Sequence, residues 1–295
     1  MIGKIVVLAV PGLLASVAAA TPVVYGTTFS GPHSASTLYS ISAASGAAKA
    51  IGAIGFNQVR TMAFAPNGSL FGVGRNGADK WVLLKIDLIS GAGTAVGPTG
   101  LDASFRDIVF RSDGTLYGYA RSTSPDVKAG LVYAVNTNTG AARLVGNLAE
   151  ASDENAPVAF SSDKVLYSVG TRSLAMIAAN NSGAVTPLQF GSSLAGFQPA
   201  AAKFDSGTGT LWALGKKGGS APENYLATVD VKTGTVAPVA KTTAGLQGIA
   251  IEPHDFGPPP PPGPLPSSIL FIISGVLAIA LWNAWAHFRR RNAAV

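Results

Sequence analysis

The stretch Phe110-Arg-Ser-Asp-Gly-Thr-Leu-Tyr-Gly-Tyr119 decides the fold of this chain. It predicts a strand, a two-residue Asp-Gly turn and a second strand, with apolar side chains alternating along both arms. The leucine that follows the turn recurs 46, 50 and 45 residues apart, at Leu70, Leu116, Leu166 and Leu211. The same hairpin pattern therefore surrounds each of these leucines, at Phe64–Val73, Phe160–Val169 and Phe204–Leu214 besides the quoted stretch.

A repeat of this length made only of strand signals is typical of a β-propeller with one blade per repeat. Each repeat contains four strand signals, and each class of strand occurs five times. The predicted fold class is all-β: a five-bladed β-propeller with four-stranded blades, plus one C-terminal transmembrane helix. A sixth blade in divergent sequence is the alternative, but about 46 residues per blade lies within the usual range and favours five.

The two ends of the repeat region are expected to pair. The chain begins at a second strand and ends at an inner strand, and a ring of blades must close without an open sheet edge. We therefore expect Leu246–Glu252 to pair with Val23–Thr27, so that N- and C-terminal strands share the closing blade.

Composition limits the function classes. The 295 residues include 35 Gly and 19 Pro, and only 12% are charged, which suits a turn-rich β fold. The absence of Cys excludes disulfides and thiolate metal sites. The formal charge of +6 arises mainly from Lys4 and Arg289–Arg291. No basic patch remains between them, so nucleic acid is not expected as a partner.

The predicted domain boundaries begin with residues 1–20, which have the layout of a secretory signal. Lys4 precedes a short apolar stretch, and Ala18-Ala19-Ala20 offers a cleavage site. An uncleaved anchor is the alternative, but the apolar stretch is short for a membrane span and Pro11 interrupts it. The propeller is then expected over residues 21–253.

Three further segments are predicted after the propeller. Residues 254–266 form a proline-rich stalk, because the run Pro258–Pro262 favours extended polyproline II. Residues 267–288 form a membrane-spanning helix, since the stretch is long enough and its apolar residues cover every face. Residues 289–295 form a basic tail that stays cytoplasmic.

The last thirty residues resemble the tripartite sorting signals of the PEP-CTERM class, handled by exosortases in Gram-negative bacteria. Its parts here are Pro264-Leu265-Pro266, the apolar stretch Ile269–Phe288 and the cluster Arg289-Arg290-Arg291. Leu265 stands where the usual motif has Glu, as in Pro-Leu-Pro variants. The resemblance implies an exosortase-type processing enzyme as partner. It also implies export to the outer face of the cytoplasmic membrane, then to the cell surface or extracellular matrix. A plain single-span anchor is the alternative.

The propeller repeats resemble a loose bacterial family with a Leu-Tyr-x-Ile-Asp…Thr-Gly…Val-Gly pattern, and more distantly NHL and YVTN repeats. Leu38-Tyr-Ser-Ile and Val82-Leu-Leu-Lys-Ile-Asp87 carry this pattern. The resemblance implies an exported propeller and no particular activity.

A search for chemical groups finds three His residues without metal-ligand spacing, and no catalytic triad motif. No metal and no cofactor is therefore expected. Most aspartates of the repeats are expected to serve as turn residues, namely Asp87, Asp113, Asp163 and Asp230. The candidates for catalysis are Asp107, Asp153 and Glu154, which lie off the turn pattern, although solvated loop positions are the simpler interpretation of Asp153 and Glu154.

A second group of residues predicts a ligand site. Four residues before the inner-strand aromatic, or its equivalent, the repeats place Arg60, Arg106, Ala156, Ala200 and Gln247. Equivalent positions at the start of inner strands approach the central channel, so Arg60, Arg106 and Gln247 are predicted to bind a carboxylate or an acidic sugar. The alternative is that the arginines pair with Asp107, Asp102 or loop carbonyls.

The leading functional interpretation of the sequence is a non-enzymatic, surface-displayed binding or scaffolding module. The partners expected are the processing enzyme, the membrane through the C-terminal helix, and an acidic polysaccharide or a surface protein. The second interpretation is an extracellular carbohydrate-active enzyme with carboxylates at the channel mouth. A third is a passive matrix protein.

Overall fold

The structure is a computed structural model that describes residues 22–29, 31, 33–121, 130–147, 157–161, 166–169, 174–177, 185–188, 197–218 and 223–253. The predicted signal, stalk, membrane-spanning segment and basic tail lie outside these residues. The described part is all-β and contains no helix, so within it no segment meets the requirements for a transmembrane helix.

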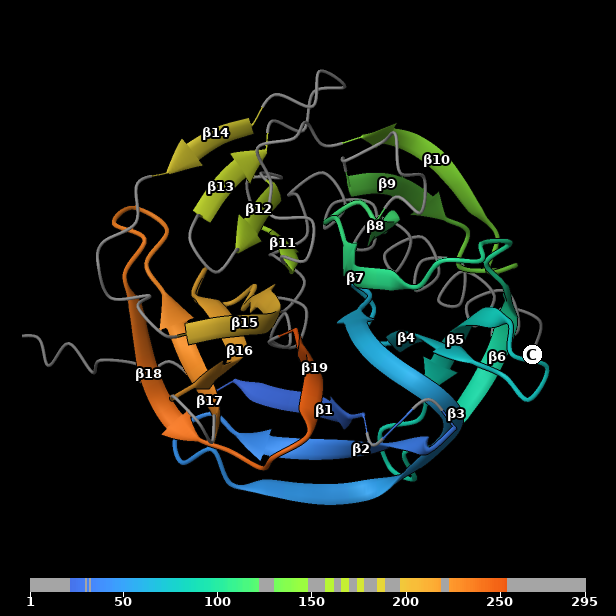
Figure 1. Cartoon of the computed structure of the whole chain (residues 1–295), viewed down its shortest axis with the longest axis horizontal. Helices are drawn as coiled ribbons and strands as arrows, with labels where there is room; N and C mark the ends of the chain where they lie inside the picture. The colour runs from blue at the N-terminus through green and yellow to red at the C-terminus, as the bar shows by residue number, and fades with distance from the viewer. Residues whose placement is uncertain are drawn as a thin grey trace, which may run out of the picture. The chain divides into compact units, whose positions relative to one another are not determined.

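Nineteen strands run through the described residues (Figure 1). They are β1 (Val23–Thr28), β2 (Ala35–Ser42), β3 (Ala48–Phe64), β4 (Leu70–Arg75), β5 (Trp81–Ile86), β6 (Gly93–Pro98), β7 (Phe105–Phe110), β8 (Leu116–Arg121), β9 (Gly130–Val135), β10 (Ala142–Asn147), β11 (Val158–Phe160), β12 (Leu166–Val169), β13 (Leu174–Ile177), β14 (Val185–Leu188), β15 (Phe197–Phe204), β16 (Leu211–Lys217), β17 (Glu223–Val229), β18 (Val236–Lys241) and β19 (Leu246–Ile251).

The hairpin predicted from the quoted stretch is present between β7 and β8, but the prediction of a two-residue Asp-Gly turn is wrong. The Arg111 N–H donates to the Thr115 carbonyl and the Gly114 N–H to the Arg111 carbonyl, so the turn consists of Ser112, Asp113 and Gly114. Phe110 pairs with Leu116, and the Arg111 and Thr115 backbones close the turn. Gly114 has a φ of 83°, a conformation that glycine adopts without steric cost. The Asp113 carboxylate accepts a hydrogen bond from the Thr115 N–H at 3.0 Å, as expected for a turn aspartate.

Asp87 and Asp230 also accept backbone hydrogen bonds within their turns, so these two predictions are confirmed. Asp163 lies outside the described residues.

The strands form three four-stranded antiparallel sheets and one seven-stranded sheet. The four-stranded sheets are β7–β10, β11–β14 and β15–β18, and the seven-stranded order is β19-β1-β2-β3-β4-β5-β6. The larger sheet arises because β3 is 17 residues long and pairs with β2 through its first part and β4 through its second.

Two separate strands were expected within Ala48–Phe64, an outer one and an inner one. The structure joins them, because no chain-reversing turn lies between them. The backbone is re-aimed instead at Gly55 and Gln58, whose φ values are 80° and 54°.

The expected pairing of the two chain ends is present. β19 and β1 are antiparallel, with Val24 opposite Ile251 and Gly26 opposite Ile249. The Glu252 N–H also donates to the Val23 carbonyl at 3.0 Å. The first strand therefore has a hydrogen-bonded neighbour on both sides.

In the unit formed by residues 1–254, one strand of each repeat lies innermost (Figure 1). These strands are β3, β7, β11, β15 and β19, and each contacts the next in this order, while β19 contacts β3. These contacts bring inner-strand residues that lie far apart in the sequence close together in space.

Aromatic pairs join neighbouring repeats, as the period-two pattern predicts. Four pairs have ring centroids 5.4 to 5.6 Å apart: Tyr25–Phe64, Phe71–Phe110, Tyr117–Phe160 and Tyr167–Phe204. At the fifth equivalent place, Trp212 and Ile251 belong to the same buried cluster. Apolar burial between sheets thus supplies the main cohesion of the fold.

The outer strands approach the turns of the next repeat backbone to backbone. A Cβ on Gly52 would lie 2.0 Å from the Ser90 carbonyl oxygen, and one on Gly97 would lie 2.1 Å from that of Thr139. The same relationship links the last repeat to the first, where a Cβ on Gly46 would lie 2.2 Å from the Lys241 carbonyl oxygen. Only glycine allows this separation.

Candidate anion site at the bulges of the inner strands

Four of the inner strands, β3, β7, β15 and β19, share an irregularity at one position. On β7, Phe105 and Asp107 pair with the consecutive residues Ala120 and Tyr119, so Arg106 is left without a partner in the ladder. A β-bulge of this kind bends the strand and re-aims a side chain.

Three other inner strands, β15, β19 and β3, have a register shift at the equivalent place. Ala200 on β15 and Gln247 on β19 are skipped in the same way. On β3, the register shift between Asn57 and Thr61 includes Arg60. Four of the five residues singled out by counting along the sequence, Arg60, Arg106, Ala200 and Gln247, therefore lie at register shifts of the inner strands.

The four described bulge residues line a single pocket of about 260 Å³. The lining consists of Arg60, Ser104, Phe105, Arg106, Gln198, Pro199, Ala200, Lys216 and Gln247. The predicted trio Arg60, Arg106 and Gln247 is thus brought together, and Ala156, the fifth equivalent, lies outside the described residues.

The pocket is rich in hydrogen-bond donors and positive charge. Two guanidinium groups and one ammonium group line it, and none of the described lining residues is acidic. Gln198, Gln247 and Ser104 add polar groups that can donate and accept hydrogen bonds. Such a set suits a ligand that carries negative charge and hydroxyl groups.

Arg60 is held in a fixed orientation inside the pocket. Its guanidinium carbon lies 3.9 Å above the centroid of the Phe29 ring. Its Nε atom is buried and has no hydrogen-bond partner among the described residues. Burial lowers the pKa of Arg60, and the nearby charge of Arg106 lowers this pKa further. The negative charge of a bound anion would raise the pKa of Arg60 and so counteract both effects.

The alternative pairing of the arginines is not found among the described residues. Asp107 forms its ion pair with Lys203 instead, at 2.5 Å between Nζ and Oδ1. Asp102 is exposed and forms no ion pair with Arg60 or Arg106 in the described part of the chain.

The prediction that Asp107 is a catalytic candidate is wrong, because its carboxylate is buried in an ion pair. Its side chain is 2% exposed, and it accepts hydrogen bonds from Thr61 Oγ1 at 2.6 Å, the Val158 N–H at 3.2 Å and Lys203 Nζ at 2.5 Å. Burial raises the pKa of Asp107, while Lys203 acts in the opposite direction. A carboxylate that is enclosed in this way serves structure rather than substrate. The other two candidates, Asp153 and Glu154, lie outside the described residues.

Several pocket residues carried no signal in the sequence. Lys216 lies near the end of β16, and Gln198 precedes the bulge of β15. Ser104 and Phe105 flank Arg106 on its N-terminal side. The positions of Gln198 and Lys216 could have been predicted only from the register of β15 on β16, which pairs these two residues.

The described residues contain no group of three His, Asp or Glu side chains that could hold a metal ion. Of the three histidines, only His33 is within the described part of the chain. The expectation that no metal or cofactor is required stays a prediction.

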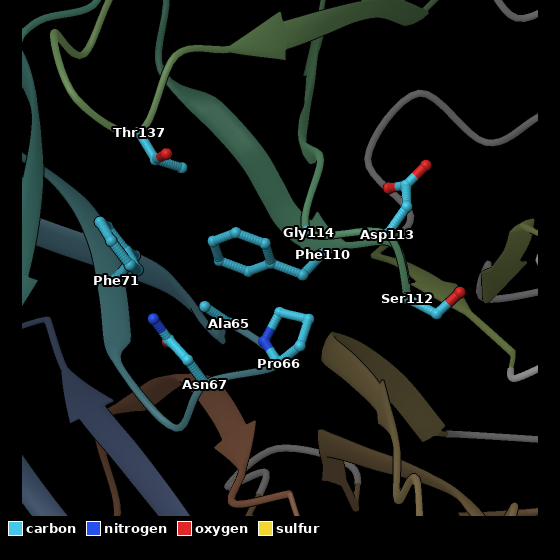
Figure 2. A pocket seen from close by; sticks show the side chains of 9 residues that line it. All are labelled: Ala65, Pro66, Asn67, Phe71, Phe110, Ser112, Asp113, Gly114 and Thr137. Atoms are coloured by element: carbon cyan, nitrogen blue, oxygen red, sulfur yellow. The ribbon is translucent and has the colours of Figure 1, made fainter.

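A second pocket, of about 340 Å³, lies where the β3–β4 and β7–β8 hairpins meet (Figure 2). The rings of Phe71 and Phe110 and the side chain of Pro66 face into it, with Asp113 to one side. The Asp113 carboxylate is already engaged by Arg111 and by its own turn. Asp113 of the second pocket thus serves its turn, whereas no ion pair engages Arg60, Arg106 or Lys216 of the first pocket within the part of the chain that the structure describes.

No known family model matches the chain, and no curated protein matches it. Solved structures do resemble it. TolB from Acinetobacter baumannii is 14% identical with a TM-score of 0.48, covering 76% of this chain and 54% of TolB. The chain therefore spans about half the length of TolB. The periplasmic gluconolactonase PpgL of Pseudomonas aeruginosa is 15% identical with a TM-score of 0.45, covering 76% and 83%. Regucalcin from Agrobacterium tumefaciens is 17% identical with a TM-score of 0.45, covering 78% and 81%.

These similar structures are β-propeller proteins. The prediction of an all-β fold is confirmed for the described residues by their own strands. One of the similar structures is named as periplasmic. Export of this chain stays a prediction. Nothing in the comparisons concerns exosortase sorting, and that resemblance stays a prediction.

The leading functional expectation, a non-enzymatic binding or scaffolding module, is corrected. Several of the similar structures are gluconolactonases, which are enzymes by name. At 11% to 15% identity and TM-scores of 0.41 to 0.45 the likeness concerns the fold and assigns no reaction.

Proposed function

We propose that the protein is an exported, five-bladed propeller enzyme that acts on a carboxylated carbohydrate. The observation that carries this proposal is the pocket at the bulges, where Arg60, Arg106 and Lys216 converge without an acidic residue among the described lining. A pocket of about 260 Å³ is close to the lower limit for small-molecule sites, which suits one sugar ring or a little more.

The blade count of five is supported by the strand pairings. β1 lies between β19 and β2, and β3 continues that sheet, which gives a four-stranded group built from both chain ends. The same β3 starts a second group with β4, β5 and β6, and three further sheets follow. Contacts among the five inner strands lead from β3 around to β19 and back.

The residues of the pocket have distinct proposed roles. Arg60 and Arg106 bind the carboxylate of the sugar through forked, charge-assisted hydrogen bonds. Gln198 and Gln247 hydrogen-bond to sugar hydroxyls, and Lys216 adds positive charge at the rim. Asp153 and Glu154, which precede β11 in the sequence, are the proposed acid and base for hydrolysis.

The proposed location follows from the sequence. A signal over residues 1–20 exports the chain, and residues 267–288 span the membrane or direct sorting by an exosortase-type enzyme at Pro264-Leu265-Pro266. The propeller then faces the outside, where acidic polysaccharides occur.

A matched pair of ligands tests the proposal. Purified full-length protein is titrated calorimetrically with tetragalacturonate and with its fully methyl-esterified form, which has the same sugars without the charges. Binding of the acid and not of the ester is expected, with loss of binding in Arg60→Ala/Arg106→Ala. Arg143→Ala is the control, because Arg143 lies on the exposed outer strand β10. Equal binding of both ligands would contradict the anion site.

The enzymatic part needs its own measurement. Oligogalacturonates incubated with the protein are analysed by mass spectrometry for shortened products. Asp153→Asn/Glu154→Gln is expected to abolish product formation while calorimetric binding persists. A wild-type protein that binds and leaves a panel of acidic oligosaccharides unchanged would show that the pocket is no active site.

A further inference from the structure

Arg60 and Arg106 can stay close together in the pocket only if other interactions fix the strands that carry them. Both carry positive charge, and the charge of Arg106 lowers the pKa of Arg60, which means that the two groups repel each other. Left free, long side chains on separate strands would move apart. The residues that follow the arginines in the sequence, Thr61 and Asp107, supply the connection.

Thr61 and Asp107 join β3 to β7 directly. The Thr61 hydroxyl donates to Asp107 Oδ1 at 2.6 Å and accepts from the Ile108 N–H at 2.8 Å. Both residues are buried. A hydrogen bond to a charged group in such a place is short and strong. It fixes the two bulges relative to each other.

Lys203 completes the connection from a third strand. Its Nζ lies 2.5 Å from Asp107 Oδ1, although β15 and β7 are separated by β11 in the order of inner strands. Lys203 follows the pocket residues Pro199 and Ala200 on β15. The Asp107 carboxylate therefore links β3, β7 and β15. All three strands carry residues of the pocket.

We propose that Thr61, Asp107 and Lys203 are positioning residues that hold Arg60 and Arg106 side by side, and so set the affinity of the pocket for an anion. The effect on affinity rests on the proposed function. The effect on the position of Arg60 does not, because exchange of the Arg60 Nε–H with water can be measured without a ligand.

A matched pair of substitutions tests the inference. Thr61→Val keeps the shape and removes the hydroxyl, whereas Thr61→Ser keeps the hydroxyl. In full-length protein, exchange of the Arg60 Nε–H with water is measured by NMR, with the signal assigned through Arg60→Lys. Faster exchange is expected in Thr61→Val and near-wild-type exchange in Thr61→Ser, because the Nε atom is buried in the native arrangement.

The affinity for tetragalacturonate is measured on the same proteins. A loss of about tenfold is expected for Thr61→Val and little change for Thr61→Ser. A folded Thr61→Val protein that keeps both wild-type exchange and wild-type affinity would overturn the inference. If the wild type binds no anion, the proposed function fails, and Arg60 exchange alone then decides the positioning role.

A second variant covers failure of Thr61→Val to fold. Asp107→Leu/Lys203→Met replaces the buried pair with apolar groups of similar size, a change that cores often accept. Asp107→Asn/Lys203→Met is its control, since the asparagine retains an acceptor for Thr61. Faster Arg60 exchange in the leucine variant than in the asparagine variant is expected, and equal exchange would contradict the positioning role.

Discussion

Gly248 on the last strand packs directly against the backbone of Arg60, so that a Cβ on Gly248 would lie 2.5 Å from the Arg60 carbonyl oxygen. This contact connects the C-terminal end of the repeat region with the pocket. It places β19 and β3 so that Gln247 and Arg60 line the same cavity. The position of β19 beside β3 and the shape of the site therefore depend on the same contact.

Gly248→Ala is expected to displace the Arg60 segment of β3. The added methyl group has no space, and overpacking of this kind costs about 1–3 kcal/mol of the free energy of unfolding. Chemical denaturation measures this loss, and calorimetry measures an accompanying loss of affinity for an acidic oligosaccharide. Gly77→Ala is the control, because no described atom lies within 4 Å of its Cβ. Equal stability of the two variants would contradict the contact.

Gly52→Ala tests the backbone contact between an outer strand and the next turn. The new Cβ would lie 2.0 Å from the Ser90 carbonyl oxygen, which can move only if the turn shifts. A loss of about 1–3 kcal/mol in the free energy of unfolding is expected. Anion affinity should stay near that of the wild type, because neither residue lines the pocket. A variant that loses affinity but not stability would contradict this separation.

Lys203→Met leaves the Asp107 carboxylate buried without its charged partner. Removing one member of a buried pair lowers the free energy of unfolding by about 3–5 kcal/mol. Because replacement of both members avoids an unpaired buried charge, Asp107→Leu/Lys203→Met should recover most of this loss. Thermal or urea unfolding of the two variants provides the comparison. A double variant less stable than Lys203→Met would mean that the pair itself stabilises the fold.

The lowered pKa of the turn residue Asp230 should make the free energy of unfolding depend on pH. Hydrogen bonds from the Lys232 backbone and the Thr233 side chain lower the pKa of Asp230 below its ordinary value of 3.8. A lowered folded-state pKa contributes stability above pH 3.8 that is lost as pH falls through the folded pKa. The stability difference between wild type and Asp230→Asn should therefore shrink below pH 3.8. A difference that stays constant through this range would contradict the lowered pKa.

Much of the fold could be predicted from local sequence signals. The Asp113-Gly114 turn and the alternating residues around it specify a hairpin without reference to the rest of the chain. The β1–β19 pairing was predicted because the repeat region begins at a second strand and ends at an inner strand. The continuity of β3 could not be predicted, because it depends on how Gly55 and Gln58 bend the backbone.

The candidate site was predictable only where the repeat itself gave the position. Arg60, Arg106 and Gln247 were found because equivalent positions in a repeat occupy equivalent places. Lys216 had no such signal. The structural role of Asp107 was hidden because its partner Lys203 lies 96 residues further along the chain. Long-range pairing of this kind depends on how the inner strands meet, which local patterns do not encode.

The most direct test of the anion site follows the arginine side chains themselves. Full-length protein is titrated with tetragalacturonate while NMR records the Nε–H signals of its arginines. Saturable shifts are expected for Arg60 and Arg106 and none for Arg143, with no shift on addition of the methyl ester. If the Arg60 and Arg106 signals stay unchanged at millimolar ligand, or shift no more than that of Arg143, the pocket at the inner-strand bulges is not an anion site.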